Sequence, residues 1–146
     1  MTLTPWSLGA GKGNKFLPEY NYSTPDTVWD HWGFTKEQLA ADNLNSQIYN
    51  SFLDGTKSAL EMAAVVNGCR GLSCPKTLNF PPAGYHDLAR LLRPTAQGGQ
   101  TEVYGTVEVT SSMERDGRNV HNHARHGVFV VIEGTSHNSA ASQATS

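Results

Sequence analysis

Residues 50 to 69 read NSFLDGTKSALEMAAVVNGC, and this stretch decides the fold. Nearly every residue from Ala59 to Val66 is apolar or small, so we expect a helix that is buried on most of its circumference. Asp54 can accept a backbone hydrogen bond from the first helical turn, and Gly55 permits a sharp bend before it. Gly68 is a typical helix end. The stretch therefore predicts one buried central helix.

Two ionisable side chains, Lys57 and Glu61, interrupt this apolar segment. At 100° per residue they lie about 40° apart and one turn from each other, so we expect them to touch. One interpretation is a helical salt bridge, although Lys before Glu is the less favourable order for the helix dipole. The other is a polar stripe facing a cleft, where Asp54, Lys57 and Glu61 converge and shift one another's pKa values. Both interpretations stay open.

Size and charge limit the function classes. The 146 residues allow one domain, which we place at residues 1–135, followed by a polar tail at 136–146 with too little apolar surface to order itself. The formal net charge of -2, with Lys and Arg scattered singly, argues against nucleic acid or an anionic membrane as partners.

The sequence also lacks targeting and disulfide patterns. No apolar run approaches the roughly 20 residues needed to span a bilayer. The first residues do not resemble a signal peptide. We therefore expect a soluble cytoplasmic protein, with Cys69 and Cys74 as free thiols because no second pair accompanies them.

The segment from 9 to 15 reads GAGKGNK. Three glycines at alternate positions predict a loop that approaches another group closely, with Lys12 and Lys15 presenting charge to it. The glycine spacing is neither that of a dinucleotide fingerprint nor that of a Walker A loop. Two interpretations stay open: a lysine-bearing anion loop and a flexible solvated loop.

The remaining patterns predict an α+β fold, with a mixed or antiparallel sheet covered by helices on a face. Residues 128–132 are apolar without interruption, which is typical of a central strand. Helices are expected at 25–32, 35–41 and 85–92, strands at 2–8, 48–53, 102–112, 120–125 and 127–133, an extended connection at 72–82 and a hairpin turn at 114–118.

His121, His123 and His126 are the most conspicuous group of metal-binding residue types. A strand would place His121 and His123 on one face, as part of a zinc or iron site. No carboxylate accompanies them in sequence, and histidines beside a hairpin turn more often form a solvated edge. We therefore predict no metal site. The chain also lacks a Gly-x-Ser-x-Gly nucleophile elbow.

Five segments follow one another in an order that carries a resemblance: GKG at 11–13, STPDTV at 23–28, NSFLDGTK through EMAAV at 50–65, SSMERDGR at 111–118 and GVFVV at 127–131. This order resembles the middle of the homoserine dehydrogenase-like oxidoreductases, and in particular the 1-deoxy-D-xylulose 5-phosphate reductoisomerase-like (DRL) family. The similarity runs from about Leu8 to Glu133. Members of that family are similar in having a Rossmann domain for NADPH, a central catalytic domain and a C-terminal segment.

The resemblance implies that residues 1–135 are the catalytic, substrate-binding domain alone. NADP would then be bound mainly by a nucleotide-binding domain in cis or in trans, and we expect the isolated chain to be inactive. The reaction implied is hydride transfer to or from a small, anionic hydroxy or carbonyl metabolite. The alternative is a non-catalytic remnant that binds a small metabolite or another subunit. Self-association into a homo-oligomer is a further partner hypothesis.

Hydride transfer at carbon requires a proton to move at oxygen, so a cationic donor and a carboxylate are needed nearby. We predict that Lys57 polarises the substrate oxygen, while Asp54 and Glu61 orient it or relay its proton. The predicted substrate-binding residues are Lys12, Gly13, Asn14 and Thr56. Among these, Lys12 is expected to hold the anionic group of the substrate.

Overall fold

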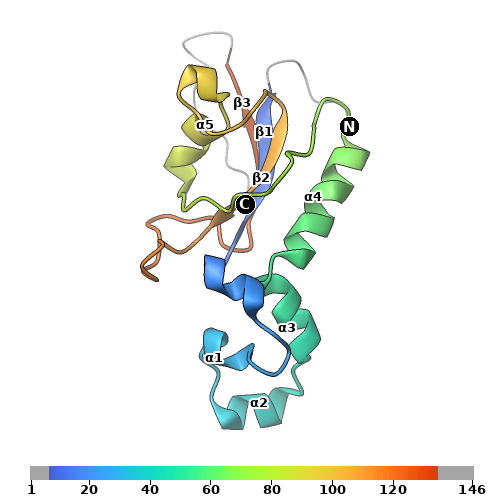
Figure 1. Cartoon of the computed structure of the whole chain (residues 1–146), viewed down its shortest axis with the longest axis vertical. Helices are drawn as coiled ribbons and strands as arrows, with labels where there is room; N and C mark the ends of the chain where they lie inside the picture. Colours follow the sequence, from blue (N-terminus) through green and yellow to red (C-terminus); the bar gives the residue numbers. More distant parts are fainter. Residues whose placement is uncertain (1–6, 135–146) are drawn as a thin grey trace.

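The computed structural model describes residues 7–134. They form an α+β arrangement around a three-stranded mixed sheet (Figure 1). Strand β1 (Ser7–Asn14) lies in the centre, parallel to β2 (Thr106–Ser111) and antiparallel to β3 (Val128–Ile132). The prediction of an α+β fold with a mixed sheet is confirmed.

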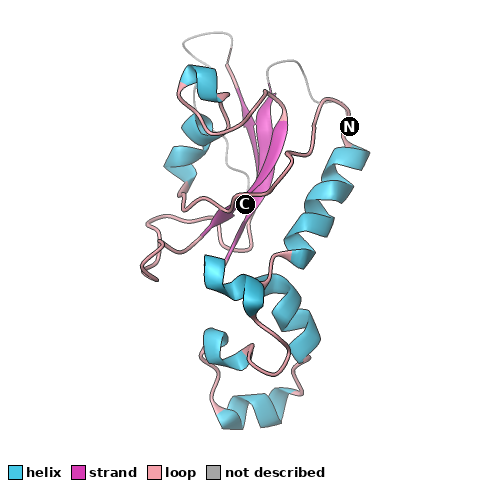
Figure 2. Cartoon of the chain, in the orientation of Figure 1, coloured by secondary structure: helices cyan, strands magenta, loops and turns pink. Residues whose placement is uncertain are grey.

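Five α-helices of residues 7–134 lie outside this sheet (Figure 2). They are α1 (Trp29–Trp32), α2 (Lys36–Asp42), α3 (Ser46–Leu53), α4 (Thr56–Gly68) and α5 (Leu88–Leu91), with short 3-10 helices at Pro18–Tyr22, Tyr85–Asp87 and Thr95–Gln97. Figure 1 shows α4 beside the sheet on one side and α5 on the other, while α1 to α3 gather at one end. None of the described helices is long and apolar enough to cross a bilayer.

The glycine-rich segment that was predicted as a loop is the central strand β1. Gly9, Gly11 and Gly13 alternate along it and so share one face. A Cβ added at Gly11 would lie 1.9 Å from the carbonyl oxygen of Glu108 and 2.7 Å from the ring of Phe129. The loop prediction was wrong because here the glycines serve close packing of the neighbouring strands rather than flexibility.

Strand β3 lies at an edge of the sheet, so the prediction of a central strand there was also wrong. Phe129 is buried on the face that α5 covers. On the other face Val128, Val130 and Ile132 are 72%, 47% and 66% exposed. The apolar run therefore does not mean that both faces of the strand are covered.

Residues 48–53, predicted as a strand, belong to helix α3. The side chain of Asn45 accepts hydrogen bonds from two backbone N–H groups of the first turn, which fixes the start of the helix. Tyr49 and Phe52 then lie on one side of α3 and pack against the aromatic rings of α1. This packing of aromatic side chains outweighs the strand propensity of the segment.

Helix α4 is not the buried central helix that its composition predicted. Only Ser58 and Met62 are buried, whereas Leu60 is 68% exposed and Ala59 and Ala64 are also exposed. One stripe of α4 packs on β1 and β2, its start also contacts α3, and Ala59, Leu60 and Ala64 face outward. Its alanines therefore favour the helical conformation rather than forming a core.

Most other local predictions are confirmed. Thr35 forms a capping box at the start of α2, α4 ends at Gly68, and the backbone N–H of Glu114 donates to the carbonyl of Arg118 across the predicted hairpin turn. Three predictions hold only in part: the helix expected from 25 begins at Trp29, the strand at 102–112 is limited to β2, and 120–125 forms only isolated bridges. The tail at 136–146 and residues 2–6 of the strand predicted at 2–8 lie outside the described residues.

Candidate functional site

An ion cluster joins β1 to α4. The ammonium group of Lys12 on β1 donates to the carboxylate of Glu61 on α4, and the Nζ atom of Lys57 lies 3.2 Å from the other oxygen of this carboxylate. The Lys12 side chain is 11% exposed, whereas those of Lys57 and Glu61 are 40% and 38% exposed. The predicted contact between Lys57 and Glu61 is confirmed, and the structure adds Lys12 from a distant part of the chain.

Strand and helix geometry explain this meeting. The glycines of β1 occupy one face of the strand, so Lys12 shares the opposite face with Ala10, which packs against α4. Lys57 and Glu61 lie one turn apart on the flank of α4. The Nζ atom of Lys57 also lies 4.9 Å from the centre of the Phe52 ring, a cation–π contact that helps to position it.

The two lysines hold Glu61 in its charged form. Partial burial raises the pKa of Glu61, but hydrogen bonds and attraction from Lys12 and Lys57 outweigh it and lower the pKa below its ordinary value. One carboxylate thus lies between two ammonium groups. The cluster keeps a net positive charge that faces solvent through Lys57.

Asp54 and Thr56 belong to the other flank of α4. One oxygen of Asp54 accepts from the backbone N–H of Thr56 at 2.8 Å, and the other accepts from the side chain of Asn50 at 3.1 Å. Asp54 therefore accepts a backbone hydrogen bond from the first turn, as expected, although the N-cap position of α4 is occupied by Gly55. The structure brings Lys57 and Glu61 together but directs Asp54 away from them.

A cavity of about 420 Å³ opens on this second flank. It is lined by Asp54, Gly55, Thr56, Ala59, Met62, Cys74, Pro75, Lys76, Thr77, Leu78 and Phe80. Of the predicted site residues, Asp54 and Thr56 line it, whereas Lys12, Lys57 and Glu61 do not. The predicted site is thus divided between two sides of one helix.

Gly13 and Asn14 hold the end of β1 in place. The side chain of Asn14 is buried and donates to the carbonyl of Phe52 at 2.7 Å, which ties α3 to the sheet. The N–H of Gly13 donates to the carbonyl of Gly127, and a Cβ on Gly13 would lie 2.0 Å from the carbonyl oxygen of Ala124. Both residues therefore position Lys12 and have little surface to offer a ligand.

Arg125 and His126 lie beside this end of β1. Arg125 is bridged to Gly13, and the backbone N–H of His126 donates to the carbonyl of Gly13. The Arg125 guanidinium donates to the Ser112 hydroxyl at 2.8 Å and to the Asn119 side chain at 3.2 Å. Within residues 7–134 no carboxylate forms an ion pair with Arg125. No local sequence pattern linked these residues to Lys12.

The positive charges near this end of β1 act on the neighbouring basic groups. Partial burial and the positive charges of Arg125, Lys12 and His123 lower the pKa of His126. Burial and the charge of Arg125 likewise lower the pKa of Lys15. The end of β1 is therefore an electropositive region, suited to an anionic group.

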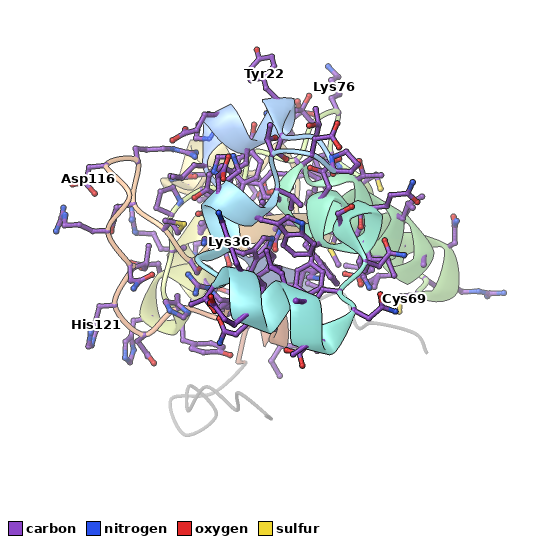
Figure 3. All side chains as sticks on the ribbon, turned by 90° about the horizontal axis from the view of Figure 1, so that it is seen from below. Tyr22, Lys36, Cys69, Lys76, Asp116 and His121 are labelled. Atoms are coloured by element: carbon purple, nitrogen blue, oxygen red, sulfur yellow. The ribbon has the colours of Figure 1, made fainter. Side chains whose placement is uncertain are left out.

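The histidines do not form a metal site in the part of the chain that the structure describes. His121 lies at the outer rim of the molecule (Figure 3). The Nδ1 atom of His123 accepts a hydrogen bond from the backbone of Arg125. Among residues 7–134, no three His, Cys, Asp or Glu side chains are grouped so that they could hold a metal ion.

Residues 7–134 do not fit the pyrophosphate of a dinucleotide either. Such a group needs glycines at a strand-to-helix turn, where the backbone can approach it. The glycines of β1 instead lie within the sheet, and the backbone of β2 covers Gly9 and Gly11. This arrangement leaves no cradle for the nucleotide on β1.

Glu108 on β2 is an ionisable residue that the sequence patterns did not indicate. It is 5% exposed and accepts hydrogen bonds from the backbone N–H groups of Asn79 and Val109. Burial raises its pKa despite these hydrogen bonds. Glu108 also lines a second cavity, of about 300 Å³, between β2 and the segment 75–79. The sequence feature that could have indicated its burial was its position within the alternating strand pattern at 106–111.

Comparison with known proteins gives one finding that covers almost the whole chain. The model of a protein family described as "Oxidoreductase DRL, catalytic domain" matches residues 3–145. No curated protein gives a significant match.

Proposed function

This chain belongs to the DRL oxidoreductase family as its catalytic domain, and we propose that Lys12, Lys57 and Glu61 serve the reacting oxygen of a small anionic substrate. The substrate class is a hydroxy or carbonyl metabolite. The reaction is hydride transfer with NAD(P)H. The observation that carries the proposal is the placement of one carboxylate between two ammonium groups, one of them nearly buried and the other accessible.

Each member of the cluster has a chemical role in this proposal. When a carbonyl is reduced, its oxygen gains negative charge and must receive a proton. Lys57 is accessible and donates that proton, or withdraws it in the reverse direction. Glu61 holds the Lys57 ammonium in place through the contact at 3.2 Å. Lys12 keeps Glu61 charged and stabilises the developing negative charge.

The positive charge of Arg125 beside β1 supports an anionic substrate. Arg125 and His126 lie next to Gly13, directly after Lys12 in β1, and Arg125 has only neutral partners among the described residues. A group of positive charges attracts and orients an anion before the reaction begins. Asp54 has no part in this step, because both its oxygens already accept hydrogen bonds that hold the start of α4.

The nicotinamide supplies or accepts the hydride when it is bound. Since residues 7–134 do not fit the dinucleotide, we assign it to a nucleotide-binding domain, joined in cis or associated in trans. The same misfit favours a second candidate function. In this alternative, the chain binds a small anionic metabolite or another subunit and catalyses no reaction.

The test is turnover of the chain combined with a nucleotide-binding domain of the same family. NADPH oxidation is followed with a panel of small hydroxy and keto compounds that carry carboxylate or phosphate groups. We expect Lys57→Ala to lower kcat by about 10²- to 10⁴-fold, the usual contribution of a general acid. The matched control is Lys36→Ala, at an exposed lysine on α2 (Figure 3).

Two outcomes would reject catalysis by this cluster. Equal turnover of wild type and Lys57→Ala would remove Lys57 from the mechanism. An inert wild-type chain that still binds members of the anionic panel would favour the second candidate function.

A further inference from the structure

Residues 73–82, which we name the strap, run along the outer edge of β2. Isolated bridges join the two ends of the strap to Thr106 and Ser111. The strap therefore places ten residues beside the six residues of β2. Among the described residues, no backbone hydrogen bond joins residues 74–80 to β2. The middle of the strap is thus held away from the strand that its two ends accompany.

The extra length leaves space on both sides of the strap. The cavity of about 420 Å³ lies between the strap and α4, and the cavity of about 300 Å³ lies between the strap and β2. Pro75, Lys76 and Thr77 line both of them. The middle of the strap is therefore the wall that separates the two cavities.

Glu108 joins this middle part to β2. The backbone N–H groups of Val107 and Ser111 donate to carbonyls at the two ends of the strap. Val109 lies between them in β2, and its N–H donates to the carboxyl group of Glu108 at 2.8 Å. The same carboxyl oxygen accepts from the backbone N–H of Asn79, on the strap, at 3.1 Å. One buried side chain thus replaces the backbone contact that the strap does not make here.

The far end of the strap has separate supports. The ring of Phe80 is buried and stacks on Phe16, with ring centres 4.1 Å apart. The guanidinium of Arg115 donates to the carbonyl of Phe80 at 3.2 Å. Phe80 also has a φ of 48°, which a residue other than glycine rarely adopts unless the surrounding structure imposes it. Residues 74–79, by contrast, are all exposed or only partly buried, so they are the part that can move.

We propose that the strap opens and closes at residues 74–79, with Glu108 as the latch that holds it closed. In the closed state the Glu108 carboxyl group links Asn79 to Val109. When this link breaks, residues 74–79 move away from β2, and the two cavities become one space that small molecules can enter. The hinge lies next to Phe80, where the backbone is already in an unusual conformation.

The latch responds to pH. In the closed strap, burial raises the pKa of Glu108 above its ordinary value of 4.5. Opening lets water reach the carboxyl group and removes this effect. The closed state therefore binds the proton more tightly, and opening becomes more favourable as pH rises from 4.5 through the pKa of the closed state. The other charged groups around this carboxyl are Lys76 and Glu102, which line the same cavity, and Arg115, which donates to the strap.

The test is hydrogen exchange of single amide groups, followed by NMR in the full chain at several pH values. Rates are expressed as protection factors, which removes the ordinary dependence of exchange on pH. We expect the protection of the Asn79 N–H to fall as pH rises above 4.5, by up to about tenfold per pH unit, and then to level off. The N–H groups of Ser73 and Ser111, which are bonded at the two ends of the strap, should keep their protection.

Two substitutions at Glu108 isolate the latch. Glu108→Gln keeps a side-chain oxygen for the N–H groups of Asn79 and Val109 but cannot lose a proton, so protection of Asn79 should stay high at every pH. Glu108→Ala removes the acceptor, and protection should be low at every pH. Glu102→Gln is the matched control, because it removes an exposed carboxyl group of the same cavity and should behave as wild type. Circular dichroism and thermal unfolding show whether each variant is folded.

The proposal is wrong if protection of Asn79 in the wild type does not change with pH, or if Glu108→Gln shows the same change. Loss of protection at Asn79, Ser73 and Ser111 together would also overturn it, because the whole edge would then unfold. If Glu108→Ala does not fold, wild type and Glu108→Gln still decide. The ion cluster around Glu61 lines neither cavity, and no measurement here is of turnover, so the proposed function can fail separately.

Discussion

Glu61 and Glu108 lie on opposite sides of the sheet and differ in their electrostatic surroundings. Glu61 lies between Lys12 and Lys57, and these two ammonium groups lower its pKa despite partial burial. Glu108 is more deeply buried, receives hydrogen bonds from amide groups, and has a raised pKa because burial dominates. The pKa of the same residue type is therefore shifted in opposite directions on the two sides.

This difference shows what makes a charged site in a small domain. Burial alone makes a carboxylate costly to ionise, as at Glu108. Nearby cations keep Glu61 ionised, and its partial exposure leaves it within reach of a ligand. We therefore place the charge-dependent chemistry on the Glu61 side and regard Glu108 as a constraint on stability.

The largest effect on turnover in this comparison is expected from a substitution in the ion cluster around Glu61. Lys12→Met keeps the length of the side chain but removes the ammonium group that pairs with Glu61. We expect kcat in the combined assay to fall about 100-fold, because the stabilisation of the developing charge is lost. Steady-state kinetics measure this, with Lys36→Met as the control. Unchanged kcat would show that Lys12 is only structural.

A smaller effect is expected where α4 begins, on its other flank. Asp54→Ala removes the acceptor for the Thr56 N–H and the partner of Asn50. We expect the free energy of unfolding to fall by about 1 kcal/mol, the usual net contribution of a hydrogen bond. Urea denaturation measures it.

Asp54→Asn provides the matched control, because the side-chain oxygen of asparagine can still accept from the Thr56 N–H. It should restore most of the stability. Turnover per folded molecule should stay near wild type in both variants. A large loss of kcat in Asp54→Asn would return Asp54 to the catalytic group.

The smallest effect is expected at Glu108. Its pKa is higher in the folded chain than its ordinary value of 4.5, so the folded state binds more protons than the unfolded state between these two values. Stability contributed at this site is therefore lost as pH rises from 4.5 through the folded pKa. Glu108→Gln cannot ionise and should lack this decline.

Denaturation of wild type and Glu108→Gln across this pH range gives the measurement. The variant should gain stability relative to wild type as pH rises, and the difference should level off above the folded pKa. A constant difference would mean that Glu108 titrates normally and that its contrast with Glu61 is wrong.

Sequence spacing identified the part of the site that lies within one helix. Lys57 and Glu61 are one turn apart, so their contact follows from helix geometry alone. The hydrogen bond from the first turn of α4 to Asp54 could likewise be predicted from its position. By contrast, nothing local connects Lys12 to Glu61, because that contact depends on where β1 lies in the sheet.

The wrong predictions share a physical cause. The structure that a local sequence pattern adopts depends on the residues that pack against it in the fold. The alternating glycines of β1 are typical of a loop by sequence, but the structure shows that they make room for the backbone of β2, the Phe129 ring and the backbone of Ala124. The apolar sequence of α4 suggested full burial, but a three-stranded sheet covers only one stripe of the helix. Glu108 lies at a buried position of β2. The alternating pattern of this strand indicates such a position, but a charged residue does not by itself predict burial.

The central claim is that the Lys57 ammonium serves a reacting oxygen of the substrate. Chemical rescue tests it most directly: Lys57→Ala, combined with the nucleotide-binding domain, is assayed with increasing ethylammonium. The account predicts that turnover rises with amine concentration in Lys57→Ala and not in wild type, because the free ammonium occupies the vacated position and donates the proton. A Lys57→Ala variant that is inactive but unresponsive to every small primary amine would contradict it.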